Sequence, residues 1–138
     1  MNDEVVALLV NDRQDLFRTL EQLLRHLGIE TRHAHDCSEA RTLLGGPWSP
    51  RLIFTDTALI DGTWREVLSL ANATQKAVPV IVVSRFVDIE LYLQTLESGV
   101  CDFIVPPLSS SDVAHVVRTA VLKNCNDSSH TVRRSAVA

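Results

Sequence analysis

The sequence lacks most features that would place it in a specialised class of protein. Its 138 residues include only 5 glycines and 5 prolines, with no low-complexity block, which excludes collagen-like and compositionally disordered chains. No apolar run approaches the ~18 residues needed to cross a membrane. The N-terminus has no basic segment before an apolar stretch, so no signal peptide is visible. We therefore expect a cytoplasmic protein with no membrane partner.

Cysteine and catalytic motifs are scarce as well. Cys37, Cys101 and Cys125 are far apart and form no CxxC or metal-ligand pattern, so we expect reduced thiols. No GxGxxG motif or P-loop follows the first apolar run, which argues against a nucleotide-dependent enzyme. Ser84 has no GxSxG context, which argues against hydrolase chemistry.

The charge of the chain is unremarkable in sign and size. The net charge is −4, and the isoelectric point is about 5.7. The basic residues near the C-terminus are too sparse for a nucleic-acid surface, so we expect no nucleic-acid partner. With 46% hydrophobic and 22% charged residues, the chain has the composition of a single globular domain.

Short apolar runs alternate with segments of helical period. Each run is a strand candidate, and each is followed by apolar residues three or four positions apart, as in an amphipathic helix. Five such βα units predict a doubly wound α/β domain with a parallel sheet and helices on both faces. The predicted strands are Val5–Val10, Ile29–Ala34, Arg51–Thr55, Val80–Val83 and Asp102–Val105, with Ile29–Ala34, the most polar, near an edge.

Two local signals refine this pattern. Ser38 is placed to cap a short helix that ends at Leu44. The pair Asp61-Gly62 is a common hairpin turn, but the following segment has a helical period. We therefore reject a hairpin at that point.

Polar groups follow several of the predicted strands. With strand order 2-1-3-4-5, Asn11-Asp12, Asp56, Ser84 and Pro106-Pro107 converge on one crevice at the carboxyl edge of the sheet. Two carboxylates roughly 5 Å apart would repel by about 3 kcal/mol at an effective dielectric near 20. A cation such as Mg²⁺, which takes one or two carboxylates plus waters, would relieve that repulsion. The pattern predicts a small acidic pocket that holds Mg²⁺ and a phosphoryl group on Asp56; alternatively, Asp56 only begins a turn.

These segments, in this order, resemble the receiver domain of two-component response regulators. The resemblance runs from about Val5 to Lys123, and implies a flavodoxin-like (βα)5 fold. Its pieces are the first-strand end Leu9–Asp12, the strand and loop Phe54–Gly62, Val83-Ser84 and the approach Gly99–Phe103. We assign 1–123 to the receiver domain and 124–138 to a polar tail or linker.

The resemblance implies a role for each site residue. Asp56 would accept a phosphoryl group from a histidine kinase or phosphotransfer protein. Mg²⁺ would bind Asp12, Asp56 and the backbone carbonyl of Ala58, with Asn11 in an indirect role. Ser84 would move toward the phosphoryl group and let Phe103 turn inward. The chain would be a signalling protein of bacterial type rather than an enzyme, acting on a downstream protein that the sequence does not identify, and homodimers would be allowed by analogy.

The sequence departs from the family where a lysine is expected. Pro106 occupies that position, and proline can neither carry charge nor donate a hydrogen bond. Asn11 stands in place of one of the family's acids, so one negative charge is lost together with the positive charge of the lysine. The expected pocket charge therefore stays at −2. Arg85, after Ser84, is the nearest replacement cation, with Arg13 a poorer one. We expect Arg85 either to bind the phosphoryl group or to pair with Asp56 and block it. The alternative function is a pseudo-receiver, a phosphorylation-independent protein-interaction module.

Overall fold

Five parallel strands form the central sheet of the computed structural model, which describes residues 5–13 and 15–122. The strand order is β2-β1-β3-β6-β7, which confirms the predicted doubly wound topology. β2 lies at an edge and exposes most of its residues, as its polar sequence indicated. The strands are β1 (Val6–Val10), β2 (Glu30–Ala34), β3 (Leu52–Asp56), β6 (Val80–Val83) and β7 (Asp102–Ile104).

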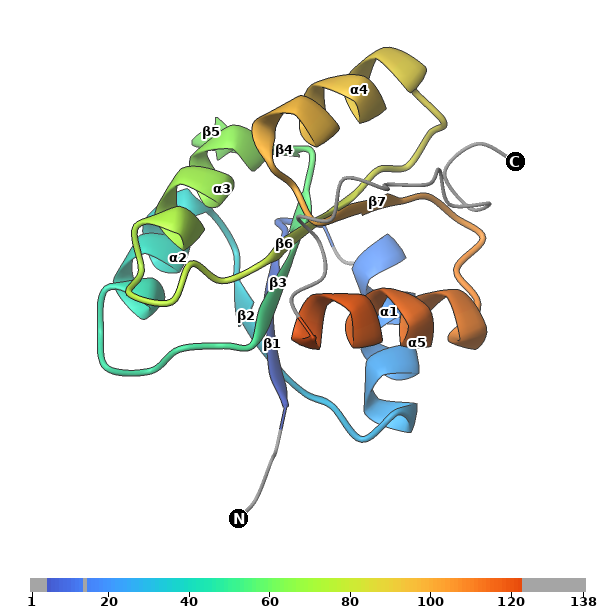
Figure 1. Cartoon of the computed structure of the whole chain (residues 1–138), viewed down its shortest axis with the longest axis horizontal. Helices are drawn as coiled ribbons and strands as arrows, with labels where there is room; N and C mark the ends of the chain where they lie inside the picture. Colours follow the sequence, from blue (N-terminus) through green and yellow to red (C-terminus); the bar gives the residue numbers. More distant parts are fainter. Residues whose placement is uncertain (1–4, 14, 123–138) are drawn as a thin grey trace.

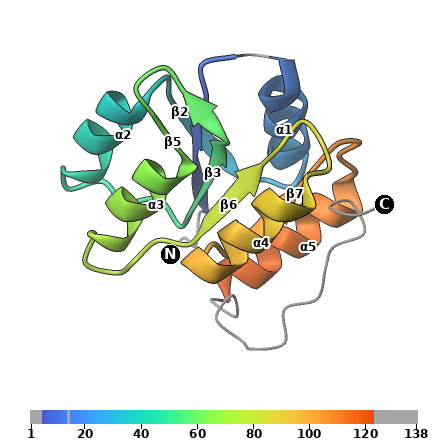
Figure 2. The ribbon, with the colours of Figure 1, turned by 90° about the horizontal axis from the view of Figure 1, so that it is seen from above.

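Helices cover both faces of this sheet (Figures 1 and 2). The helices α1 (Asp15–His26) and α5 (Ser110–Val121) pack on one face. The helices α2 (Cys37–Leu44), α3 (Trp64–Asn72) and α4 (Ile89–Ser98) contribute to the core on the other face. Both faces of each central strand are therefore buried, which explains the continuous apolar runs in the sequence.

Successive residues of a strand enter opposite cores. In β1, Leu8 belongs to the core under α2, α3 and α4, whereas Leu9 belongs to the core under α1 and α5. The same alternation places Ile53 in the first core and Phe54 in the second. These side chains are fully buried, so the sheet is a rigid support for the loops at its carboxyl edge.

The register of the central strands aligns their carboxyl ends. Val10 of β1 is opposite Thr55 of β3, and Asp56 of β3 is opposite Val83 of β6. Asn11 and Ser84 directly follow Val10 and Val83. The strand pairing thus brings three predicted site residues to one level of the sheet edge.

Two expectations about local structure are wrong. The N-cap of α2 is Asp36 rather than Ser38, because the Asp36 carboxylate accepts a hydrogen bond from the backbone N–H of Glu39. A small hairpin is also present where we rejected one: β4 (Ala58–Leu59) pairs antiparallel with β5 (Gly62–Thr63). The helical period starts only at Trp64, so two-residue strands fit between Asp56 and α3 without interrupting that helix.

The cysteines differ in state. Cys37 is a buried free thiol, whereas Cys101 is disulfide-bonded, so the expectation of reduced thiols is wrong for Cys101. Cys125 and the predicted tail 124–138 lie outside the described residues. Within the described part of the chain, no helix is long and apolar enough to cross a membrane.

Candidate functional site

A cleft of about 400 Å³ lies at the carboxyl edge of the sheet, beside the ends of β3 and β6. It includes Asp12, Asp56, Ala58, Ser84 and Arg85, five of the residues predicted to form the site. The full lining is Asp12, Arg13, Asp56, Thr57, Ala58, Leu59, Ile60, Ser84, Arg85 and Phe86. The topology therefore brings these side chains together as the sequence pattern predicted.

Asp56 is held by two different donors. Its side chain is only 3% exposed, and its Oδ1 accepts a hydrogen bond of 2.7 Å from the backbone N–H of Thr57. Nη1 of Arg85 donates to Oδ1 at 3.0 Å and to Oδ2 at 2.9 Å. A single guanidinium nitrogen thus bridges both carboxylate oxygens, and the Arg85 side chain, 21% exposed, covers them from the cleft.

This ion pair changes the charge of the pocket. Counting only Asp12 and Asp56 gave a charge of −2, but the guanidinium groups of Arg85 and Arg13 each contribute +1, so the formal charge of the cleft lining is 0. Arg13, the cation that seemed the poorer candidate, also lines the cleft. The pocket is therefore less acidic than the sequence count indicated.

The Ser84 hydroxyl is engaged with its own loop. It donates to the carbonyl oxygen of Phe86 at 2.7 Å and accepts from the backbone N–H of Phe86 at 3.2 Å. The residue is 4% exposed and lies one position beyond Val83, the partner of Asp56 in the sheet. Ser84 thus lies at the carboxyl edge of the sheet, as predicted. Its hydroxyl is hydrogen-bonded to the segment that leads into α4.

Phe103 lies inside the protein rather than in the cleft. The residue is 1% exposed, and its ring packs edge to face on Tyr92 of α4, with centroids 5.6 Å apart. The inward position expected after Ser84 moves is therefore already occupied in this structure.

The residues predicted to hold Mg²⁺ supply oxygen atoms of suitable kind. Asp12, Asp56 and Ala58 all line the cleft. Asn11 is buried, its amide nitrogen donates to the carbonyl of Arg13, and its Oδ1 has no hydrogen-bond partner. Among the described residues no cluster of three or more His, Cys, Asp or Glu side chains could hold a metal ion. Two carboxylates with carbonyl, amide and water oxygens still fit Mg²⁺, which commonly keeps several waters.

Pro106 contributes nothing to the lining of this cleft. The cations that line it are Arg13 and Arg85, neither of which occupies the family's lysine position. The sequence reasoning missed two exposed apolar residues at the cleft, Ile60 (82% exposed) and Phe86 (76%). Their signal was an apolar side chain in a loop at the carboxyl edge of the sheet.

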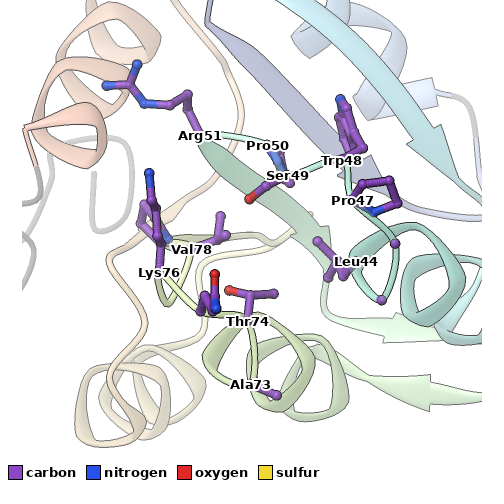
Figure 3. Close-up of a pocket in the computed structure, with 14 residues that line it drawn as sticks. Leu44, Pro47, Trp48, Ser49, Pro50, Arg51, Ala73, Thr74, Lys76 and Val78 are labelled. Carbon is purple, nitrogen blue, oxygen red and sulfur yellow. The ribbon is translucent and has the colours of Figure 1, made fainter.

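A larger cleft of about 840 Å³ lies at the opposite end of β3 (Figure 3). The loops 44–51 and 73–79 line it, including Trp48, Arg51 and Lys76. None of the predicted site residues lies in this second cleft. The chemistry expected from the sequence is thus confined to the carboxyl edge.

Comparisons with known proteins agree with this fold. PilR, a response regulator protein of Pseudomonas aeruginosa, is 29% identical over 116 residues, which cover 83% of this chain and 26% of PilR. NtrX of Brucella abortus is 25% identical with a TM-score of 0.77, covering 87% of this chain and 27% of that one. A receiver domain protein of Clostridium thermocellum, 16% identical, has a TM-score of 0.75 and covers 87% and 96% of the two chains.

The chain spans about a quarter of the length of PilR. Residues 7–118, most of the described chain, match the sequence model of the response regulator receiver domain. The chain therefore belongs to the response regulator receiver domain family.

Proposed function

We propose that this receiver domain is phosphorylated on Asp56 with Mg²⁺ in the cleft, and that phosphorylation changes a surface that binds a downstream protein. The observation that carries this proposal is the position of Arg85. Its guanidinium supplies a cation beside the acceptor carboxylate, where Pro106 has removed the family's lysine. Arginine is well suited to phosphate because its planar group presents several donors at once.

The phosphodonor would be a histidine kinase or phosphotransfer protein, as for the family. A carboxylate oxygen of Asp56 attacks the phosphorus atom of the phosphohistidine, and a new P–O bond forms. The bond from phosphorus to the histidine nitrogen breaks, and its electron pair stays on that nitrogen. The domain itself is then a phosphoacceptor rather than an enzyme with a substrate of its own.

Asp12, Asp56 and the Ala58 carbonyl would hold Mg²⁺, with Asn11 acting indirectly. When bound, the ion would neutralise charge on the transferring phosphoryl group. Arg85 must first release Asp56, because its Nη1 donates hydrogen bonds to both carboxylate oxygens. Its partly exposed side chain can then turn to a phosphoryl oxygen, so Arg85 acts first as a cover and later as a ligand.

Ser84 and Phe103 are proposed to pass the change on. If the Ser84 hydroxyl turns to the phosphoryl group, the carbonyl of Phe86 loses its donor. The loop from Phe86 to the start of α4 then becomes free to move. Since Phe103 is already buried against Tyr92 of α4, we expect the change to pass through α4 rather than through an inward turn of the Phe103 ring.

The specific competing function is a pseudo-receiver that binds its partner without phosphorylation. The same ion pair favours it, because a carboxylate bound by arginine at both oxygens is a poor nucleophile. In that case Arg85 would permanently take the place of metal and phosphoryl group.

Intact mass decides between the two functions. The protein is incubated with Mg²⁺ and a small acyl phosphate, beside an Asp56→Asn control. We expect one phosphoryl group on the parent and none on the control. If a folded parent gains none from either the acyl phosphate or a panel of histidine kinases, phosphorylation is excluded and the pseudo-receiver stands.

A further inference from the structure

The carboxylate of Asp61 binds the first turn of α2, a helix more than twenty residues earlier in the chain. Its Oδ1 accepts from the backbone N–H of Cys37 at 2.8 Å, and its Oδ2 accepts from the backbone N–H of Ser38 at 3.0 Å. Backbone N–H groups at a helix start have no partner within the helix, and they favour a negative charge. Asp61 therefore joins the loop after β3 to the N-terminus of α2 with both carboxylate oxygens.

The same contact is closely packed at the next residue. A Cβ atom added to Gly62 would lie 2.8 Å from Sγ of Cys37. Real Cβ contacts are essentially never that short, so with an alanine at this position either the loop or the Cys37 side chain would have to shift. The backbone at Gly62 thus lies against α2, directly beside the Asp61 hydrogen bonds.

Asp61 occupies the turn of the β4–β5 hairpin. In that hairpin Ala58 pairs with Thr63, and Leu59 pairs with Gly62. Ala58 lies two residues after Asp56 and lines the cleft. The hairpin therefore connects the anchor on α2 directly to the backbone that forms one wall of the cleft.

Capping of α2 does not by itself explain Asp61. The helix has its own N-cap, Asp36, whose carboxylate accepts from the backbone N–H of Glu39. Two aspartates from different segments thus bind successive amides of one helical turn. Of these two aspartates, Asp61 is the one that comes from the segment lining the cleft, so its two hydrogen bonds join the helix to that segment.

We propose that Asp61 is a positioning residue that fixes the cleft wall 57–60, and with it the Ala58 carbonyl, by anchoring the β4–β5 hairpin on α2. The role of that carbonyl toward Mg²⁺ and the phosphoryl group rests on the proposed function. The anchoring itself does not.

A matched pair of variants separates anchoring from capping. Asp61→Ala and Asp36→Ala each remove a carboxylate from the first turn of α2. We expect amide hydrogen exchange of segment 57–60 to rise severalfold in Asp61→Ala, since two hydrogen bonds to a charged carboxylate are lost. In Asp36→Ala, exchange should rise in α2 alone. Equal exchange of 57–60 in the two variants would overturn the proposal.

A second set of variants tests the contact between the hairpin and α2 without removing Asp61. Gly62→Ala should raise exchange of 57–60, because the new methyl group meets Cys37 Sγ. The double variant Gly62→Ala with Cys37→Ala should restore the parent exchange, and Cys37→Ala alone is the control. No rise in Gly62→Ala, or no restoration in the double variant, would contradict the anchoring.

Phosphorylation provides the functional readout. If the parent accepts a phosphoryl group, its rate should fall about tenfold in Asp61→Ala and stay near the parent value in Asp36→Ala. If the two variants lose rate equally, the positioning role is wrong. If the parent is not phosphorylated, the proposed function fails, and hydrogen exchange alone decides whether Asp61 anchors the cleft wall.

Discussion

Nη1 of Arg85 bridges the two carboxylate oxygens of Asp56, 29 positions earlier in the chain, at 2.9 and 3.0 Å. The strands that carry these residues are neighbours, and Asp56 pairs with Val83, two residues before Arg85. The short segment after β6 thus places the positive charge of Arg85 on Asp56, at the carboxyl end of the central strand β3. Four predictions test this site and its supporting residues.

Replacing Arg85 by alanine should strengthen Mg²⁺ binding. The change lowers the formal charge of the cleft lining from 0 to −1 and frees both oxygens of Asp56. Even after solvent screening, removal of a nearby positive charge should tighten Mg²⁺ on the order of tenfold. Titration calorimetry with Mg²⁺ measures this, with Arg118→Ala, on α5, as a control for net charge. Equal affinities of parent and Arg85→Ala would show that Arg85 does not compete with the metal.

Arg85→Ala should also alter the phosphorylated state. Without the guanidinium, the phosphoryl group loses the Arg85 hydrogen-bond donors, so the rate of phosphorylation or the lifetime of phospho-Asp56 should change severalfold. Adding Pro106→Lys to the same variant should return a cation to the position where the family has its lysine. The rate of phosphorylation and the lifetime of phospho-Asp56 should then move toward those of the parent. Time courses of intact mass follow them. Unchanged rate and lifetime in Arg85→Ala would rule out a role for Arg85 in phosphotransfer.

Phe103→Ala should destabilise the domain by about 3 to 5 kcal/mol, the usual cost of removing a buried aromatic ring. The ring is 1% exposed and touches Tyr92, so its loss leaves a cavity beneath α4. Urea denaturation followed by circular dichroism gives the value. Leu122→Ala, at an exposed position, is the matched control and should cost little. A loss below 1 kcal/mol in Phe103→Ala would mean that the ring is not part of the core.

The contact between Asp61 and α2 should make stability depend on acid pH. The amide of Cys37, and then that of Ser38, hold the pKa of the Asp61 carboxyl below its ordinary value of 3.8. Because the folded-state pKa is depressed, this contribution is present above pH 3.8 and is lost as the pH falls through the lower folded-state value. Denaturation midpoints of the parent and Asp61→Asn should therefore differ at pH 6 and converge toward pH 2. A difference that is constant over this range would exclude the ionised carboxylate as its source.

Much of the fold was readable from the sequence. Apolar runs such as Val80–Val83 correspond to strands, because a strand buried on both faces requires apolar side chains at every position. Gly28 and Gly99 mark helix ends with positive φ angles of 80° and 95°, which glycine adopts without strain. The β4–β5 hairpin was wrongly rejected despite its Asp61-Gly62 signal, because its two-residue strands are too short to show a period before the helical one of α3 begins.

The candidate site was predictable in part. Asp12, Asp56 and Ser84 follow strand ends, and the topology of a parallel sheet gathers strand ends at one edge. The sequence left two alternatives open for Arg85, and the structure shows one of them, the pair with Asp56; the binding of Asp61 to α2 had no comparable signal. Both depend on torsion angles of side chains in loops, which follow no sequence period.

The sequence by itself therefore determined the order of strands and helices, the two-sided burial of the sheet and the identity of the acids at its carboxyl edge, because these follow from the spacing of apolar and polar residues. Only the tertiary structure decided that Arg85 covers Asp56, that Phe103 lies inside and that Asp61 anchors the cleft wall on α2. The physical reason is that each of these contacts joins side chains from separate segments, whose distance and direction are set by packing rather than by local spacing.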